Sequence, residues 1–330
     1  MVITNDKLEK FISGAVRFEN SDGYLFPKRF TKAQSERLAD NDFLYKRSKA
    51  TAGMVLGFCT DTLKLSFDAV LYEASSKHIY AFDVYVDDVL RFHFSEDGIE
   101  DGAQRHIEFE LGEGSKKIRI YFPCLFAAGI KNFCIDDGST LSKLEKTRSF
   151  LFLGDSITHG CTTEFSSLTY ANILARRFDA GSLNQAIGGD VFNADNLDEA
   201  LNFEPDAIFV AYGTNDWKLG RDIASTAKAY FDKLTQIYPS RHIYVILPIF
   251  RLDAENPADT VKLPFGEFRM LLESVCGRYA NITVIDSIDF VPHFADFYED
   301  GYLHPNDMGF MCYAQALEKF LLGQSEFYRA

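Results

Sequence analysis

Four segments in the C-terminal half place residues capable of acyl chemistry at the ends of apolar runs. In SFLFLGDSITHG the apolar run ends at Gly154-Asp155-Ser156, which would present the Ser156 hydroxyl at the rim of a sheet. Backbone N–H groups that follow such a serine can face a developing negative charge. We therefore expect Ser156 to be a nucleophile, the alternative being a turn with a helix cap. The segment is not a GxSxG elbow, because Thr158 stands where that motif needs glycine.

Two further apolar runs end in residues that could donate hydrogen bonds. LNQAIGGD ends in a glycine pair, and the amide of Gly189 can approach a ligand closely because the residue has no side chain. IFVAYGTNDW places the neutral amide of Asn215 at the end of its run. A tight turn at Gly189 and an Asx-turn at Asn215 are the alternatives.

The fourth segment, EDGYLHPNDMGF, contains a histidine that could act as a general base. His304 follows an acidic loop and precedes Pro305. A Ser–His pair needs a third group to hold the imidazole in the right tautomer, and Asp300 is close enough in sequence to be that group. Asp300 could instead be a solvated loop acid.

These four segments, in this order, resemble the four blocks of the SGNH (GDSL-type) hydrolase superfamily. The resemblance covers about Ser149 to the C-terminus. It implies that Ser156 is the nucleophile and His304 the base. It also implies an oxyanion hole formed by the Ser156 and Gly189 amides and the Asn215 side chain.

One departure from the family pattern concerns the third triad member. The family usually places the aspartate three residues before the histidine, where this chain has Gly301 and Asp300 lies one position earlier. The loop could bulge by one residue. Glu299 or a backbone carbonyl could orient His304 instead.

Other residues near these segments have two possible roles. Trp217 could stack on a sugar ring or line an acyl pocket, or it could pack in the core. His159 follows the serine closely, but helix and turn geometry would point it away from the site. Three further histidines share no metal-like spacing and are expected to be exposed or packed side chains: His78, His93 and His106.

The elements that must position these residues differ between the two halves of the chain. From about residue 58 to 123 apolar and polar residues alternate, as in half-buried strands, which predicts a β-sandwich or jelly roll. The polar, turn-rich stretch Ile135–Arg148 is the expected junction. We predict an N-terminal β-sandwich domain over 1–145 and a hydrolase domain over 146–330.

In the C-terminal half, apolar strands alternate with amphipathic helices. This rhythm predicts an α/β domain with a doubly wound, flavodoxin-like parallel sheet. The expected strands are Ser149–Leu153, Leu183–Ile187, Ala207–Tyr212, His242–Leu247 and Ile282–Asp286. The expected helices are Ser167–Phe178, Ala224–Tyr238, Phe265–Tyr279 and Gly309–Leu322.

The composition and net charge of the chain limit the kinds of molecule that it is expected to bind. The chain has 330 residues, 47% of them hydrophobic, and a formal net charge of -14. This charge disfavours nucleic acid and anionic lipid, which are bound through Lys and Arg, but not a neutral sugar. The start MVITNDKLEKF lacks the features of a secretion signal, no apolar stretch is long enough for a membrane span, and the six cysteines are scattered. We expect a cytoplasmic protein without metal or organic cofactor.

The two-domain arrangement also resembles carbohydrate esterases that remove acetyl groups from plant polysaccharides. The resemblance implies a serine esterase acting on short acyl, above all O-acetyl, esters of oligosaccharides. The alternatives are a short-chain esterase, thioesterase or lysophospholipase of the same superfamily, and a non-catalytic glycan-binding protein. The N-terminal domain could shape the cleft, bind glycan or serve only structure or homo-oligomerisation.

Overall fold

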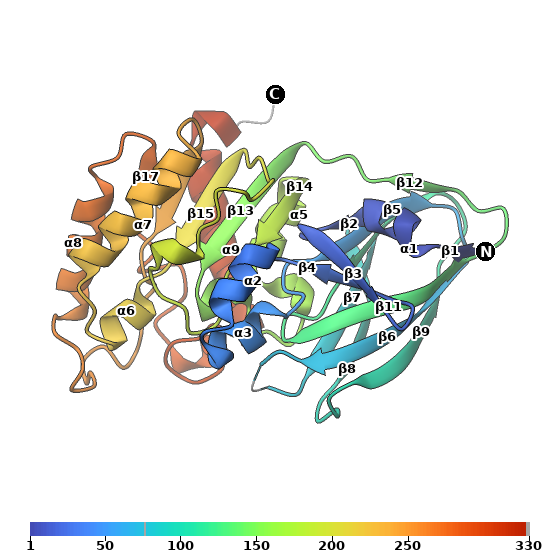
Figure 1. Cartoon of the computed structure of the whole chain (residues 1–330), viewed down its shortest axis with the longest axis horizontal. Helices are drawn as coiled ribbons and strands as arrows, with labels where there is room; N and C mark the ends of the chain where they lie inside the picture. Colours follow the sequence, from blue (N-terminus) through green and yellow to red (C-terminus); the bar gives the residue numbers. More distant parts are fainter. Residues whose placement is uncertain (76, 328–330) are drawn as a thin grey trace.

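A computed structural model describes residues 1–75 and 77–327 and shows two parts side by side (Figure 1). One part, which contains the N-terminus, is a sandwich of two antiparallel sheets. The other is a parallel sheet between helices. The predicted fold class, an α/β domain with a parallel sheet preceded by a β-sandwich, is confirmed.

The sandwich consists of two sheets whose strands pair antiparallel. The first has the order β3 (Arg17–Ser21), β4 (Tyr24–Lys28), β11 (Phe126–Ile135), β6 (Lys64–Glu73), β9 (Ala103–Glu110), with β1 (Val2–Ile3) paired to β11. The second has the order β12 (Leu141–Lys143), β5 (Val55–Thr60), β10 (Lys116–Tyr121), β7 (Tyr80–Val86), β8 (Val89–Glu96), with β2 (Ile12–Ser13) paired to β5. The last sandwich strand therefore ends only a few residues before the parallel sheet begins.

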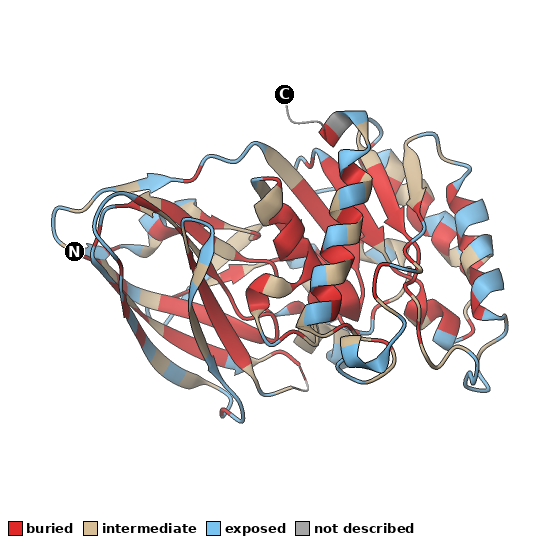
Figure 2. Cartoon of the chain, turned by 180° about the vertical axis from the view of Figure 1, so that it is seen from behind, coloured by how far each residue is buried: buried red, intermediate tan, exposed pale blue. Residues whose placement is uncertain are grey.

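The alternation read from the sequence is what builds the sandwich core. Leu65, Phe67 and Ala69 of β6 are buried, whereas Ser66 and Asp68 between them are less so. Successive side chains of a strand point to opposite faces, so one face of each sheet is apolar and packs on the other sheet. Figure 2 shows the buried residues concentrated between the layers.

The parallel sheet has the strand order of a flavodoxin-like fold. It runs β14 (Ala180–Asn184), β13 (Arg148–Gly154), β15 (Ala207–Ala211), β16 (His242–Ile246), β17 (Ile282–Ile285). The first strand of this sheet along the chain is β13. The next strand, β14, pairs on one side of β13, and the remaining strands follow on the other side. The reversal at β13 is a topological switch point, where ligands of such sheets bind.

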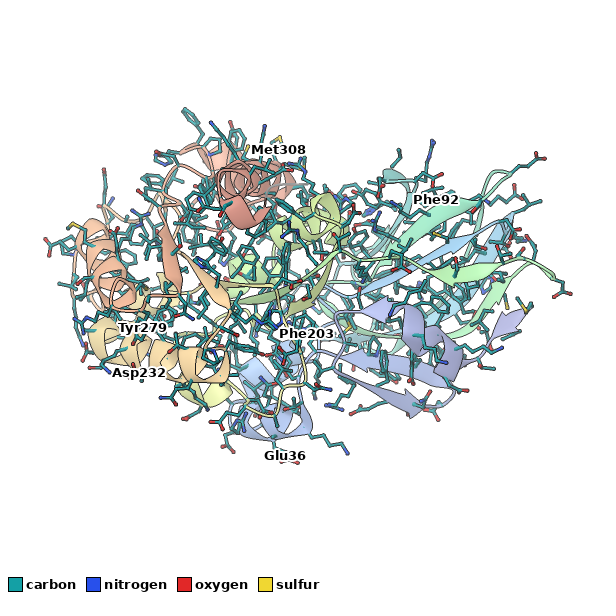
Figure 3. The ribbon with its side chains drawn as sticks, turned by 90° about the horizontal axis from the view of Figure 1, so that it is seen from above. Glu36, Phe92, Phe203, Asp232, Tyr279 and Met308 are labelled. Atoms are coloured by element: carbon teal, nitrogen blue, oxygen red, sulfur yellow. The ribbon has the colours of Figure 1, made fainter. Side chains whose placement is uncertain are left out.

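Helices cover both faces of this sheet. Phe150 and Phe152 of β13 pack towards α5 (Tyr170–Arg177) and α9 (Asp307–Leu322), while Leu151 and Leu153 pack towards α7 (Ile223–Ile237) and α8 (Phe265–Cys276). Figure 3 shows Asp232 of α7 beside Tyr279, which follows α8, and their side chains are joined by a 2.8 Å hydrogen bond. Within residues 1–75 and 77–327, none of the helices is both long and apolar enough to cross a bilayer.

The second strand of the parallel sheet is placed differently from the prediction. It spans Ala180–Asn184 rather than Leu183–Ile187. The Asn184 side chain accepts a hydrogen bond from the Ala186 amide at 2.9 Å and donates one to the Thr158 carbonyl at 2.8 Å. The regular strand ends at this Asx-turn and 185–190 form a loop, although the Gln185 and Ile187 amides still donate to the Phe152 and Gly154 carbonyls of β13 at 2.8 and 3.0 Å.

Both parts of the chain also contain short helices. In the N-terminal part, α1 (Asn5–Leu8) precedes α2 (Lys32–Leu38) and α3 (Asp42–Ser48), none of which the sequence predicted. A capping box between Thr31 and Gln34 starts α2, and the Asn41 side chain caps α3. In the parallel-sheet part, α4 (Ser156–His159) and α6 (Thr214–Lys218) follow β13 and β15 directly.

Candidate active site

Ser156 lies where the central strand of the parallel sheet passes into a helix. It is the first residue of α4, immediately after the end of β13, and is 7% exposed. The Asp155 side chain caps α4 by accepting a hydrogen bond from the Ile157 amide at 3.1 Å. The cap considered as the alternative is therefore made by Asp155, and the neighbouring Ser156 lies buried at the edge of the sheet.

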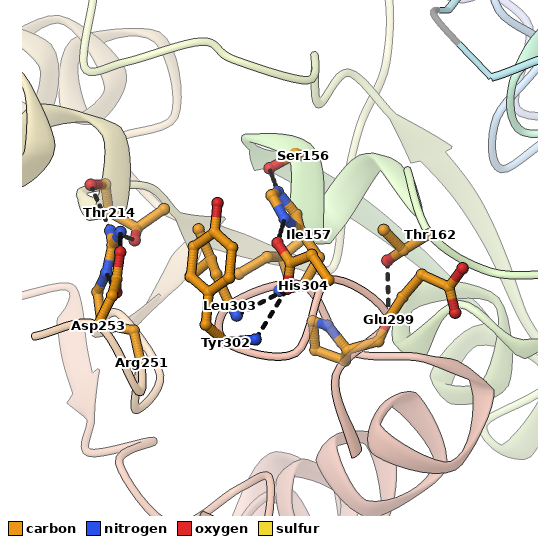
Figure 4. A network of polar contacts seen from close by, with 12 residues as sticks. Ser156, Ile157, Thr162, Thr214, Arg251, Asp253, Glu299, Tyr302, Leu303 and His304 are labelled. Atoms are coloured by element: carbon orange, nitrogen blue, oxygen red, sulfur yellow. Dashed lines mark hydrogen bonds and ion pairs between the residues drawn. The ribbon is translucent and has the colours of Figure 1, made fainter. Parts of the chain in front are cut away.

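The Ser156 hydroxyl meets the ring of His304. Ser156 Oγ lies 2.8 Å from His304 Nε2 (Figure 4). The histidine loop is fixed on both sides: the Glu299 amide donates to the His304 carbonyl at 2.8 Å, and Thr162 Oγ1 donates to the Pro305 carbonyl at 2.7 Å. The imidazole is thus held beside a residue 148 positions away in the chain.

The other ring nitrogen of His304 contacts Asp300. Asp300 Oδ2 lies 2.6 Å from His304 Nδ1. Asp300 Oδ1 accepts hydrogen bonds from the amides of Tyr302 at 3.1 Å, Leu303 at 2.9 Å and His304 at 3.0 Å. The turn closes because Gly301 has φ +79°, a conformation that glycine adopts without strain.

The electrostatics of Asp300 follow from these contacts. Burial alone would raise the pKa of its carboxyl group, but the hydrogen bonds from the His304 ring and from the Leu303, His304 and Tyr302 amides hold the pKa well below its usual range. Asp300 is therefore ionised at neutral pH beside the imidazole. The Glu299 side chain lies 3.4 Å from Lys77 Nζ instead.

Gly189 and Asn215 follow the two strands that flank β13. Gly189, with φ +89°, lies in the loop after β14, and Asn215 lies in α6 after β15. Asn215 Nδ2 donates to the Asp190 carbonyl at 2.9 Å, which joins the two loops. Since the carboxyl ends of parallel strands share one edge of the sheet, both residues lie at the same edge as Ser156.

Three buried carboxyl groups brace these loops. Burial raises the pKa of Asp155 to about 7 and those of Asp190 and Asp216 to about 6. Asp190 accepts hydrogen bonds from Asn196 and from the Tyr212 hydroxyl, and Asp216 accepts one from the Phe192 amide. Their contacts are with loop residues, which assigns them to support rather than to proton transfer.

His159 and Trp217 point away from the serine. His159 Nε2 lies 2.9 Å from the Cys124 carbonyl, and its Nδ1 accepts a hydrogen bond from the Gly188 amide at 3.1 Å. Burial lowers the pKa of His159 to about 3, so its ring is neutral. Trp217 is 3% exposed and its indole N–H donates to the Leu263 carbonyl, so the core-packing alternative describes it.

Two arginines at this edge of the sheet were not found from the sequence. The buried Arg251 guanidinium donates to the Thr214 hydroxyl at 2.9 Å and pairs with Asp253 (Figure 4). Arg29, from the N-terminal part, donates to the carbonyls of Asn184 and Ala186, both at 2.8 Å. No motif marks either residue, because the contacts of Arg251 with Thr214 and of Arg29 with Asn184 join segments 37 and 155 positions apart in the sequence.

Metal binding finds no support in the described part of the chain. Within residues 1–75 and 77–327, no group of three or more His, Cys, Asp or Glu side chains is arranged to hold a metal ion. His93 pairs with Asp83 at 2.7 Å, and His106 pairs with Asp68 at 2.7 Å and lies 4.0 Å from Glu108.

Comparison with family models gives one match. Residues 152–310 match the model of the GDSL-like lipase/acylhydrolase family. No curated protein matches the chain.

Solved structures match over both parts of the chain. A salicylyl-acyltransferase from a tetracycline biosynthetic pathway, SsfX3, has a TM-score of 0.82 at 21% identity and covers 96% of each chain. A family two carbohydrate esterase from Clostridium thermocellum, solved with cellohexaose, has a TM-score of 0.65 at 15% identity. The match covers 96% of this chain and 100% of that chain. An acetyl xylan esterase from Butyrivibrio proteoclasticus has a TM-score of 0.62 at 13% identity, and the match covers 84% of this chain and 90% of that chain. At these identities the likeness shows the fold.

The switch-point sheet and the family match define the class of protein: this chain is a carboxylic ester hydrolase with the SGNH fold. More specifically, residues 152–310 are similar to the GDSL-like lipase/acylhydrolase family, whose model they match.

Proposed function

We propose that this protein is a serine esterase that removes short acyl groups, above all O-acetyl groups, from oligosaccharides. The observation that carries the proposal is the 2.8 Å contact between Ser156 Oγ and His304 Nε2. The 2.6 Å contact between His304 Nδ1 and Asp300 supports it, because the three groups then have the relationship of a Ser-His-Asp triad.

In the proposed first step, Ser156 attacks the ester carbonyl while His304 takes the hydroxyl proton through Nε2. The imidazolium that forms is stabilised by ionised Asp300, which also keeps the Nδ1 proton in place before the attack. His304 then donates the proton to the departing alcohol. The product of this step is an acyl-enzyme on Ser156.

The tetrahedral intermediate carries a negative oxygen that needs hydrogen-bond donors. We assign the Ser156 amide, the Gly189 amide and the Asn215 side chain to this oxyanion hole. A primary amide has two N–H donors, and Asn215 uses one on the Asp190 carbonyl. In the proposal the second N–H of the Asn215 amide faces the oxyanion. The hydrogen bond to the Asp190 carbonyl fixes the direction in which this N–H points.

In the second step water replaces the alcohol. His304 takes a proton from water as its oxygen attacks the acyl-enzyme, and then returns a proton to Ser156 Oγ as the acyl group leaves as a carboxylic acid.

The substrate assignment has two supports. The net charge of -14 disfavours a polyanion or an anionic membrane surface, so a neutral acetylated sugar is the better match. The similar structures include an acetyl xylan esterase and a carbohydrate esterase solved with cellohexaose. We propose a small acylated oligosaccharide as the partner of the site, and neither nucleic acid nor membrane.

A second candidate is acyl transfer to an alcohol other than water. The likeness to the salicylyl-acyltransferase, at a TM-score of 0.82 over 96% of both chains, favours it. The same acyl-enzyme serves both reactions, which differ in the group that attacks it. Adding an alcohol acceptor and measuring the acylated acceptor against the free acid separates the two.

The test is mass spectrometry of acetylated cello- and xylo-oligosaccharides after incubation with the purified protein. Wild type should remove acetyl units, Ser156→Ala should remove nearly none, and Ser142→Ala, an exposed serine of β12, should match wild type. Full activity in Ser156→Ala would refute the nucleophile.

A fluorophosphonate probe separates the esterase from a glycan-binding protein on the same fold. The probe should label wild type at Ser156 and leave Ser156→Ala unlabelled. A binding protein would take up no label in either form.

A further inference from the structure

The helix α3 of the N-terminal part lies against the loop that carries Gly189. A Cβ atom built on Gly189 would lie 2.5 Å from Cε1 of Phe43. The Phe43 ring therefore occupies the space that a side chain at position 189 would need. It packs on the backbone of the loop whose amide we assign to the oxyanion hole.

A buried arginine holds α3 in this place. Arg29 is 1% exposed, and its guanidinium group donates hydrogen bonds to backbone carbonyls in both parts of the chain. The acceptors are Ala50 and Arg47 at the end of α3, at 2.8 and 3.2 Å, and Asn184 and Ala186 at the start of the Gly189 loop, both at 2.8 Å. One guanidinium thus ties the helix and the loop together.

A pair of buried glutamines makes a second tie. Gln34 of α2 donates to the Gln185 side chain at 3.1 Å, and Gln185 donates to the Arg29 carbonyl at 2.8 Å. Buried polar contacts of this kind fix geometry, because leaving any partner unpaired is costly. The position of Phe43 over the loop is therefore set by the fold.

The Phe43 ring is nevertheless open to solvent. The residue is 51% exposed, and the Arg47 guanidinium carbon lies 3.5 Å from the ring centroid, covering one face. Single exposed apolar residues are common and need no explanation. This one differs because a buried network holds it at the edge of the sheet that carries Ser156.

We propose that Phe43 is a substrate-contact residue on which the sugar ring of the acetylated substrate packs, an inference that rests on the function proposed above. The acetyl group is small and reacts at Ser156, which is 7% exposed, so the part that extends to a half-exposed ring is the alcohol. A sugar ring has an apolar C–H face that an aromatic ring can cover. The N-terminal part then supplies specificity to a site whose reacting groups lie in the other part.

The test compares two acetyl esters that differ only in the alcohol. With acetylated cellobiose, Phe43→Ala should raise KM about tenfold and leave kcat unchanged, as expected for one lost aromatic contact. With ethyl acetate, which has no ring to pack, Phe43→Ala should lower kcat/KM far less than it does with acetylated cellobiose. Phe43→Tyr should keep the wild-type KM for the sugar ester.

The matched control is Leu63→Ala, which removes a residue of equal exposure, 51%, from the loop before β6. An unchanged KM for acetylated cellobiose in Phe43→Ala would overturn the inference. So would an equal loss on both esters, since that pattern would mean that Phe43 only positions the Gly189 loop. Wild type that hydrolyses ethyl acetate but not acetylated sugars would overturn the proposed substrate itself, and this is seen without any variant.

Discussion

Asp300 Oδ2 contacts His304 Nδ1 at 2.6 Å although the two residues are four apart in sequence, one more than the family spacing. The extra residue is absorbed at Gly301, whose φ of +79° lets the chain turn back on itself. The second carboxylate oxygen of Asp300 holds the turn by accepting from three backbone amides. A longer loop thus arrives at the same Asp–His contact.

Replacing Asp300 tests its proposed role in the triad. Asp300→Asn keeps the acceptor for the backbone amides but removes the charge and allows the wrong imidazole tautomer. We expect kcat to fall by about 10²–10⁴-fold. The measurement is steady-state hydrolysis of 4-nitrophenyl acetate at pH 7.5. Glu299→Gln is the matched control and should keep the wild-type kcat. Equal losses in the two variants would remove Asp300 from the triad.

Asn215→Ala tests the oxyanion hole. Losing one donor to the oxyanion should lower kcat by about 10²–10³-fold with little change in KM, because the contact strengthens as charge develops. The same assay provides both constants. Asn5→Ala, which removes an exposed amide bonded to Asn20, should leave both unchanged. A rise in KM alone would assign Asn215 to ground-state binding.

Arg29 is expected to be critical for stability. Arg29→Met removes hydrogen bonds to four backbone carbonyls in a buried region, and we expect a loss of about 3 kcal/mol or more. Urea unfolding followed by fluorescence measures this loss. Arg105→Met, which breaks an exposed pair with Glu96 and an exposed hydrogen bond to the Gln104 carbonyl, should change stability by less than about 1 kcal/mol. Similar losses in the two variants would contradict this role.

The raised pKa of Asp155 predicts that the stability of the folded protein depends on pH. Burial raises its pKa from 3.8 to about 7 in the folded chain. The folded state therefore retains a proton that the unfolded state releases, and this contribution to stability is lost as pH rises from about 4 through about 7. The asparagine side chain of Asp155→Asn can still accept the hydrogen bond from the Ile157 amide, and it carries no charge at any pH.

Differential scanning calorimetry at pH 5 and pH 8 tests this effect. The Tm of Asp155→Asn relative to wild type should be higher at pH 8 than at pH 5 by about 2 °C or more. Asp61→Asn is the control: hydrogen bonds from Thr140 lower the pKa of Asp61, so its difference from wild type should be the same at both pH values. A difference for Asp155→Asn that does not depend on pH would be evidence against a buried charge there.

The fold class was predictable because local patterns and tertiary packing agree. Phe150 and Leu151 of β13 face helices on opposite sides of the sheet, so the strand is apolar throughout and reads clearly. The alternation is clearest in strands such as β9, where buried and exposed residues alternate, whereas β7 is buried on both faces. The strand after α5 was misplaced, because an apolar run continues past the Asx-turn of Asn184.

The helices α2 and α3 could not be predicted in the same way. Each has seven residues, too few to show a helical period or to be stable alone. Arg29 and Gln34 hold this segment through contacts with residues more than 150 positions away. Such contacts leave no local pattern in the sequence.

The amino-acid sequence by itself determined the fold class and the identity of the residues at the strand ends, because strand periodicity and short motifs are local properties. Only the tertiary structure decided that the carboxylate of Asp300, and not that of Glu299, contacts the His304 ring, that Trp217 is buried, and that Phe43 lies on the Gly189 loop. The reason is physical. The buried guanidinium and the close ring contact depend on groups that meet only when distant segments pack together. The turn at Gly301 is local, but the choice between the Asp300 and Glu299 carboxylates depends on its backbone conformation, which residue types alone do not specify.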